Sequence, residues 1–132
     1  MGKIFNAIAV VTAGTGLLIL GKKAREKAAE EKRRKSICCS FNDGISQNEF
    51  NDMVYLSIKN IKRLSETHID GAILYGTVLS KSGISTWRFS IDFNDYGHIT
   101  GRYWVSSDNN DSDIPLVIAN RIKTYIEQKL LQ

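Results

Sequence analysis

Residues 86–106 constrain the fold most, because they read as two antiparallel strands joined by a tight turn. Apolar and polar side chains alternate over residues 87–94, with the period of two that is typical of a strand with one buried and one exposed face. A bulged turn over residues 94–97, with its glycine in the left-handed conformation, predicts that Ile91 faces Gly101 across the hairpin. The stretch therefore predicts an antiparallel sheet.

The same register predicts candidate binding residues on the outer face of the sheet. It places Arg88 opposite Trp104, where a guanidinium group over the indole forms a cation–π pair, and it brings Asp92 diagonally near Arg102. We expect these four side chains to bind an anionic or aromatic ligand. The alternative is that they only solvate the open face of the sheet, since cross-strand pairs of this kind are common.

The amino-terminal segment predicts a membrane anchor over residues 1–21. Residues 4–20 contain no ionisable side chain, and a helix of that length spans about 26 Å, close to the thickness of a hydrocarbon core. Lys3 is the one basic side chain before this span, and a strongly basic segment follows it. The positive-inside rule therefore places the carboxy-terminal part of the chain in the cytoplasm, as a single-pass protein of the cell membrane.

A cleaved signal peptide is the rival interpretation of this segment. It would make the rest of the chain a secreted or cell-surface domain. However, residues 20–27 have no small-residue cleavage pattern of the A-x-A kind, and their positive charge resists translocation.

Residues 22–43 predict a basic juxtamembrane helix and a linker. The run KKAREKAAEEKRRK has good helix formers, and Glu30 with Arg34 and Glu31 with Lys35 lie at helical pairing distance. Near anionic head groups each basic residue contributes about 1 kcal/mol of attraction, although a topology signal alone also explains the charge. The candidate membrane-surface residues are Lys22, Lys23, Arg25, Lys27, Lys32, Arg33, Arg34 and Lys35.

This segment accounts for the basic character of the whole chain. The net charge is +4, and residues 21–35 alone carry eight basic and three acidic side chains, so the remainder is close to neutral. We therefore do not expect nucleic acid as a partner on the basis of charge.

Residues 44–132 predict one soluble domain, which begins with a helix. Ser46 and Glu49 have the spacing of a capping box, and Ile45 with Phe50 has that of a hydrophobic staple. Apolar residues then recur at intervals of three and four, which predicts that the helix runs to about Glu66.

The remaining elements are a first strand over residues 69–80, the hairpin, and a last helix over residues 115–131 that Asp113 caps. The first strand is apolar on both faces, and such strands are usually covered on both. This pattern leads us to expect that either the basic stalk or a second copy, in a homodimer, covers part of the open face.

The predicted fold class is α+β: a transmembrane helix, a basic helical stalk, and an α-β-β-β-α domain in which a three-stranded antiparallel meander packs on two helices. This order resembles the double-stranded RNA-binding domain over residues 46–131. That family places a lysine-rich cluster at the start of its final helix to meet phosphates, whereas residues 107–115 here read SDNNDSDIP. The resemblance in element order keeps a membrane-tethered nucleic-acid-binding module as an alternative function, although this acidic segment opposes it.

No set of residues in the sequence predicts catalysis. Cys38 and Cys39 are adjacent, no Cys-x-x-Cys spacing exists, and neither His68 nor His98 belongs to a recognisable catalytic or metal-binding motif. We expect no enzyme and no cofactor. The predicted function is that of a membrane-anchored cytoplasmic module that binds a protein or a ligand, with the lipid bilayer, a cytoplasmic protein and a second copy as expected partners.

Overall fold

The computed structural model describes residues 22–42 and 44–132. The predicted membrane span, residues 4–20, lies outside these ranges. Within them, no helix has both the length and the apolar character needed to cross a membrane. The elements in chain order are α1 (Lys22–Ser36), α2 (Gln47–Ile58), β1 (Leu64–Asp70), β2 (Ile73–Leu79), β3 (Thr86–Asp92), β4 (Trp104–Ser107) and α3 (Ile114–Leu130).

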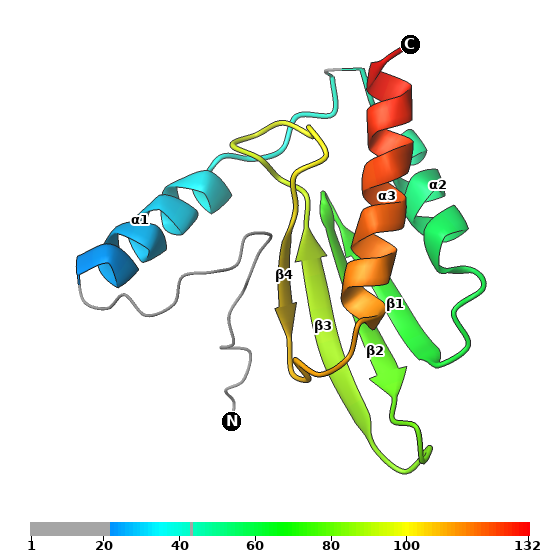
Figure 1. Ribbon diagram of the computed structural model, residues 1–132. Coiled ribbons are helices and arrows are strands. Elements are labelled where there is room, and N and C mark those ends of the chain that lie inside the picture. The colour runs from blue at the N-terminus through cyan, green and yellow to red at the C-terminus, as the bar shows by residue number, and fades with distance from the viewer. Residues whose placement is uncertain (1–21, 43) are drawn as a thin grey trace.

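The domain is α+β, as predicted, with a sheet covered by helices on one face. The four strands form an antiparallel meander in the order β1-β2-β3-β4. Helices α2 and α3 lie side by side on one face, and α1 lies away from them, beside β4 (Figure 1). The face on the side of α1 is called the outer face below.

The sheet has four strands, so the predicted three-stranded meander is wrong. Helix α2 ends at Ile58, and the residues predicted as its last turn begin β1 at Leu64. The predicted first strand splits into two at Gly71, whose φ of 61° allows a two-residue turn that pairs Asp70 with Ile73. The order α-β-β-β-β-α no longer matches the double-stranded RNA-binding domain, and the resemblance lapses.

The predicted register of the β3–β4 hairpin is also wrong. A bridge between Asp95 and His98 closes a tighter turn than expected, with Tyr96 and Gly97 both at positive φ. The chain then leaves the sheet over residues 99–103, and Ile91 pairs with Val105 instead of Gly101. The shift is four residues, an even number, so each side chain keeps its predicted face.

The core lies between the inner face of the sheet and the two helices. In α3 the apolar stripe of Ile118, Ile122 and Ile126 has no exposed surface, but Leu130 at its end is 44% exposed. Gly76 lets the Phe89 ring lie directly on β2, because a Cβ there would stand 2.4 Å from the ring.

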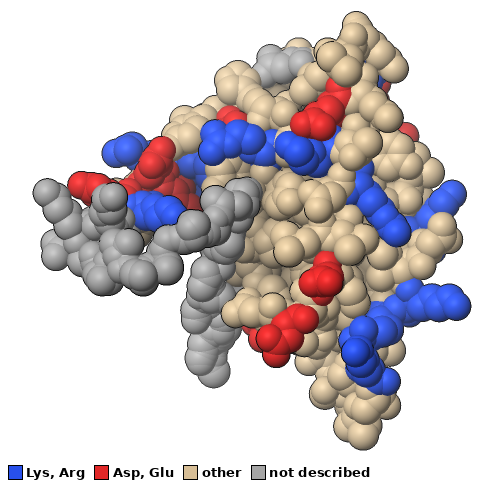
Figure 2. Space-filling model, viewed as in Figure 1, with Lys and Arg blue, Asp and Glu red and all other residues tan. Residues whose placement is uncertain are grey.

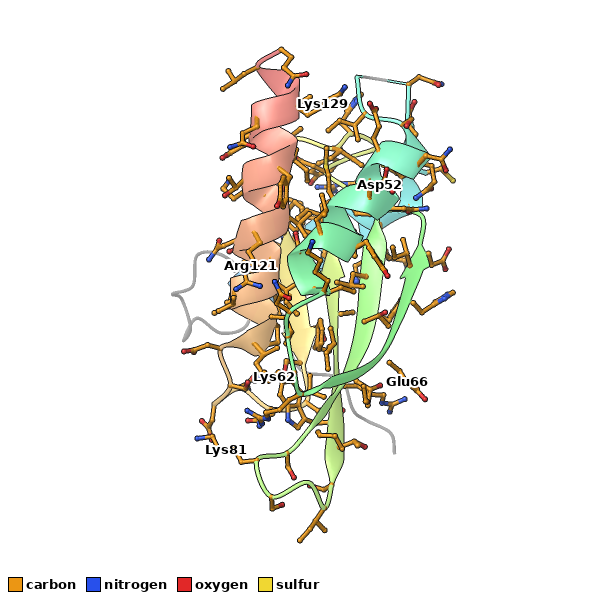
Figure 3. All side chains as sticks on the ribbon, turned by 90° about the vertical axis from the view of Figure 1, so that its right-hand side faces the viewer. Asp52, Lys62, Glu66, Lys81, Arg121 and Lys129 are labelled. Carbon is orange, nitrogen blue, oxygen red and sulfur yellow. The ribbon has the colours of Figure 1, made fainter. Side chains whose placement is uncertain are left out.

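Polar contacts hold α2 and α3 together at both ends (Figure 3). Near one end, Lys129 Nζ lies 2.8 Å from a carboxylate oxygen of Glu49, and near the other, Arg121 donates a hydrogen bond of 3.1 Å to the Ser57 carbonyl. The second contact supplies a donor to a carbonyl in the last turn of α2, because carbonyls in a last turn have no partner within their own helix.

The predicted caps of the two helices differ in outcome. The capping box is confirmed: Ser46 Oγ accepts from the Glu49 N–H, and Ser46 N–H donates to the Glu49 side chain. Asp113 occupies the N-cap position of α3, but its side chain makes no capping hydrogen bond. Ser112 Oγ accepts from the Ile114 N–H instead.

Candidate functional site

Helix α1 is held against the domain by a buried arginine. The helix forms where the sequence predicts it, but its residues are mostly charged, so it has no apolar face with which to pack. Arg34, near its carboxyl end, is nevertheless only 2% exposed. A charged side chain is buried to this degree only when the surrounding groups compensate its charge and its hydrogen bonds.

The compensation comes from the end of β3. One terminal nitrogen of Arg34 lies 3.2 Å from Asp92 Oδ2, and the other donates a hydrogen bond to the Asn94 carbonyl. The Asp92 carboxylate is itself buried and also accepts from the Asn94 N–H at 2.8 Å. Among the described residues, Arg34 Nε has no hydrogen-bond partner. Because the Arg34 guanidinium and the Asp92 carboxylate are both buried and in contact, each compensates the charge of the other away from water.

Trp104 supplies an aromatic surface at the same place. It faces Asp92 across the β3–β4 ladder, and the guanidinium carbon of Arg34 lies 3.8 Å from its ring centroid. The guanidinium carbon of Arg102 lies 5.2 Å from the same centroid. Both distances are within the range in which the negative face of an aromatic ring attracts a cation.

Two further hydrogen bonds connect α1 and the residue after it to the domain. The Tyr96 hydroxyl donates to the Glu30 carboxylate at 2.9 Å, and the Asn94 side chain donates to the Ile37 carbonyl at 2.8 Å. Partial burial raises the pKa of the Tyr96 phenol, and its hydrogen bond to Glu30 raises it further. We call this set the α1 junction; it consists of Glu30, Arg34 and Ile37 on one side and Asp92, Asn94, Tyr96 and Trp104 on the other.

The structure brings together three of the four predicted ligand-binding residues. Asp92, Arg102 and Trp104 are neighbours, but Arg88 does not face Trp104. The backbone of Arg88 pairs with Asp108, whose N–H donates to the Arg88 carbonyl at 3.0 Å. Arg34 occupies the position over the indole that the sequence assigned to Arg88.

Arg34 is the residue of this candidate site whose contacts the sequence did not reveal. Its spacing from Glu30 predicts a pair within the helix, yet Arg34 bonds to Asp92, 58 residues away, and Glu30 bonds to Tyr96. No local pattern contains a signal for contacts over such separations.

The other predicted membrane-surface residues divide into two groups. The exposed ones among the described side chains are Lys27, Lys32, Arg33 and Lys35. The side chains of Lys22, Lys23 and Arg25 lie outside the described part of the structure. Arg34 alone of the described residues in this set is buried.

A shallow hollow of about 300 Å³ lies beside the junction and is rich in donors. Its lining includes Arg102, Trp104 and Lys123. The Arg102 side chain is 67% exposed and only loosely paired, at 3.7 Å from Asp95, while Lys123 lies 3.1 Å from Glu127. Basic groups from separate segments thus line one hollow with an aromatic ring, and such groups suit an anionic partner.

Charge of both signs is spread over the rest of this side of the molecule, as Figure 2 shows. Within residues 22–42 and 44–132, no three His, Cys, Asp or Glu side chains are placed so that they share a metal ion. No family model matches this chain, and no curated protein or solved structure matches it either. The functional proposal therefore rests on the geometry of the site.

Proposed function

We propose that this protein is a single-pass membrane protein whose domain, residues 44–132, binds an acidic partner in the cytoplasm without catalysing a reaction. The proposal joins two features. The first is the apolar segment 4–20 followed by a basic helix, which favours an anchor with its following residues inside the cell. The second is the α1 junction, which connects that basic helix to the domain.

The buried Arg34–Asp92 pair is the observation that carries the proposal. A flexible tether would need no contact between α1 and the sheet, and an all-polar helix would gain nothing from packing there. Instead one buried charge pair joins the helix to the sheet. A buried ion pair is weak evidence for net stability, and in several proteins such a group specifies one arrangement. We infer that α1 holds the domain in a set orientation to the bilayer.

Exposed cations on α1 support the same orientation. Lys27, Lys32, Arg33 and Lys35 remain exposed while Arg34 is buried in the junction. Each contributes about 1 kcal/mol of attraction near an anionic leaflet. The helix therefore presents four exposed basic residues to the membrane surface and one buried arginine, Arg34, to the domain.

The proposed binding surface is the hollow beside Trp104. Asp92 is engaged by Arg34, so it is not the group that meets a partner. Arg102 and Lys123 line the hollow, and Arg88 is exposed on the outer face. We assign the partner as an acidic segment of a cytoplasmic protein, because carboxylates complement exposed guanidinium and ammonium groups.

The main argument for the nucleic-acid alternative no longer applies. That argument was a resemblance to a domain with a three-stranded sheet, whereas the sheet here has four strands. The segment before α3 remains acidic, which opposes phosphate binding there.

Protease protection of a carboxy-terminal tag tests the orientation. We expect the tag to survive protease in intact cells, to be cleaved after permeabilisation, and to stay with the membrane fraction after carbonate washing. Cleavage in intact cells, or release of a shortened chain to the medium, would support the secreted alternative and contradict the proposal.

A charge-matched pair of double variants tests the binding surface. The probe is a fluorescein-labelled oligo-glutamate peptide, and the full chain is held in detergent micelles. We expect Arg102→Gln with Lys123→Gln to weaken binding by about a hundredfold or more, since each of the two lost charge-assisted contacts is worth about 1.5–3 kcal/mol. The control, Lys59→Gln with Lys62→Gln, removes the same charge from exposed positions elsewhere. Equal weakening by both pairs would show a response to net charge alone.

A further inference from the structure

A second, larger pocket lies at the opposite end of the sheet from the α1 junction. It has a volume of about 500 Å³ and lies where the α2–β1, β2–β3 and β4–α3 connections converge (Figure 3). This is within the size range of small-molecule sites. None of its lining residues belongs to the α1 junction or to the hollow beside Trp104, so it is independent of the proposed partner surface.

A buried donor without a partner marks this pocket. Trp87 lines it from β3, and only 9% of the Trp87 surface is exposed. Among the described residues, the indole Nε1 of Trp87 has no hydrogen-bond acceptor. Native structures rarely leave a buried donor without a partner. The Nε1 atom is itself buried, so the Trp87 indole reports on the wall of the pocket and does not reach a ligand directly.

Basic side chains enter the pocket from two connections. Arg63 lies between α2 and β1, where its Nε donates to the Leu79 carbonyl at 2.9 Å, and this contact holds the guanidinium at the rim. Lys81 follows β2 and is exposed. Together they make a pair of donors that suits a carboxylate, which only accepts hydrogen bonds.

Acidic side chains enter from a third connection, between β4 and α3. Asp111 and Asp113 both line the pocket, and Asp113 makes no capping hydrogen bond to α3 with its side chain. Carboxylates suit an ammonium group, which only donates. The two kinds of charge come from different segments of the chain, so the pocket is lined by both basic and acidic side chains.

The floor between them is apolar. Ile61, Ile114 and Val117 line the pocket together with the ring of Trp87. From this combination we infer that the pocket binds a small zwitterion of the amino-acid class that has an apolar side chain. Its carboxylate meets Arg63 and Lys81, its apolar side chain lies against the Trp87 ring, and its ammonium meets Asp111 and Asp113.

The indole N–H signal of Trp87 gives a direct test in the full chain. The protein has two tryptophans, so ¹⁵N-labelled tryptophan gives two indole signals, and Trp104 serves as an internal control. The probes are L-leucine, 4-methylpentanoate, which lacks the ammonium group, and 3-methylbutylamine, which lacks the carboxylate. We expect leucine to shift the Trp87 signal saturably and to leave the Trp104 signal in place.

Each probe with a single charge should bind at least about tenfold more weakly than leucine, because it leaves one side of the pocket without its partner. Lys81→Gln and Asp111→Asn change exposed side chains, and each should weaken leucine binding by a similar factor. Lys62→Gln, an exposed neighbour outside the pocket, should leave the affinity unchanged.

Three outcomes would overturn the inference. The first is a Trp87 indole signal that leucine does not move, as when water occupies the pocket. The second is equal binding of leucine and 4-methylpentanoate, which would make the site one for apolar acids. The third is an equal effect of Lys62→Gln and Lys81→Gln, which would mean a general charge effect. None of these results depends on the membrane orientation or on the acidic partner.

Discussion

The guanidinium carbon of Arg34 lies 3.8 Å from the ring centroid of Trp104, although the two residues are on separate elements, α1 and β4. The same guanidinium pairs with Asp92, which faces Trp104 across the ladder between β3 and β4. One arginine thus contacts the ends of two neighbouring strands. Because α1 has no apolar face, we infer that this side chain decides where the helix lies.

Replacing Arg34 should destabilise the protein through the charge that is left behind. In Arg34→Met, the Asp92 carboxylate loses its partner, and α1 must move away before water reaches it. We expect the free energy of unfolding to fall by about 2 kcal/mol, below the full cost of an unpaired buried charge because the helix is peripheral. Urea unfolding followed by circular dichroism measures the loss. The control is Arg33→Met, an exposed neighbour in the same helix, which should change stability by less than about 0.5 kcal/mol. Equal effects would contradict a special role for Arg34.

The same variant should release α1 without opening the domain. A charged helix of 15 residues is marginal by itself in water, so without the junction it should unfold locally. Amide hydrogen exchange over residues 26–36 should become fast in Arg34→Met, while the exchange of α2 and α3 stays slow. Unchanged protection of α1 would show that other contacts suffice to hold it.

Gly76→Ala should be among the most destabilising single substitutions in the sheet. The added Cβ would lie 2.4 Å from the ring of Phe89, which is buried in the core. We expect a loss of about 3 kcal/mol in the free energy of unfolding. Gly71→Ala adds the same methyl group where no heavy atom lies within 4 Å, but at a φ of 61°. It should cost about 1 kcal/mol, from backbone strain alone. A smaller effect at position 76 than at position 71 would mean that the Phe89 ring moves aside.

Glu49 should make the link between α2 and α3 sensitive to acid. The hydrogen bond from Lys129 lowers the pKa of Glu49 from its ordinary value of 4.5, and the Ser46 N–H lowers it further. Because the folded-state pKa is the lower one, this stabilisation is present above pH 4.5 and is lost as the pH falls through the folded-state pKa. As the pH falls, the free energy of unfolding should decrease more steeply for the natural protein than for Glu49→Gln.

Asp52→Asn is the matched control for this experiment, since it removes an exposed carboxylate from the same helix (Figure 3). It should retain the acid-dependent loss that Glu49→Gln lacks. Parallel curves for the natural protein and Glu49→Gln would mean that Lys129 does not stabilise the charged carboxylate.

The sequence by itself determined the features that depend on neighbours a few residues apart. The capping box of Ser46 and Glu49, the helix over residues 22–36 and the alternation along β3 all follow from local spacing, and the structure confirms them. The inward faces of β3 and β4 were also readable, because they depend only on whether a residue number is odd or even along the strand. Asp70-Gly71 was a turn signal that would have revealed the fourth strand, but the apolar residues around it matched a single buried strand.

Only the tertiary structure decided the register of β4 and the position of Arg34. A register shift of four residues preserves the alternation, so the pattern cannot distinguish Gly101 from Val105 as the partner of Ile91. Arg34 and Asp92 are 58 residues apart, and they meet because the chain brings the end of α1 back to the turn that follows β3. Whether a charged residue on a polar helix faces solvent or a buried carboxylate depends on that placement. No property of its sequence neighbours determines it.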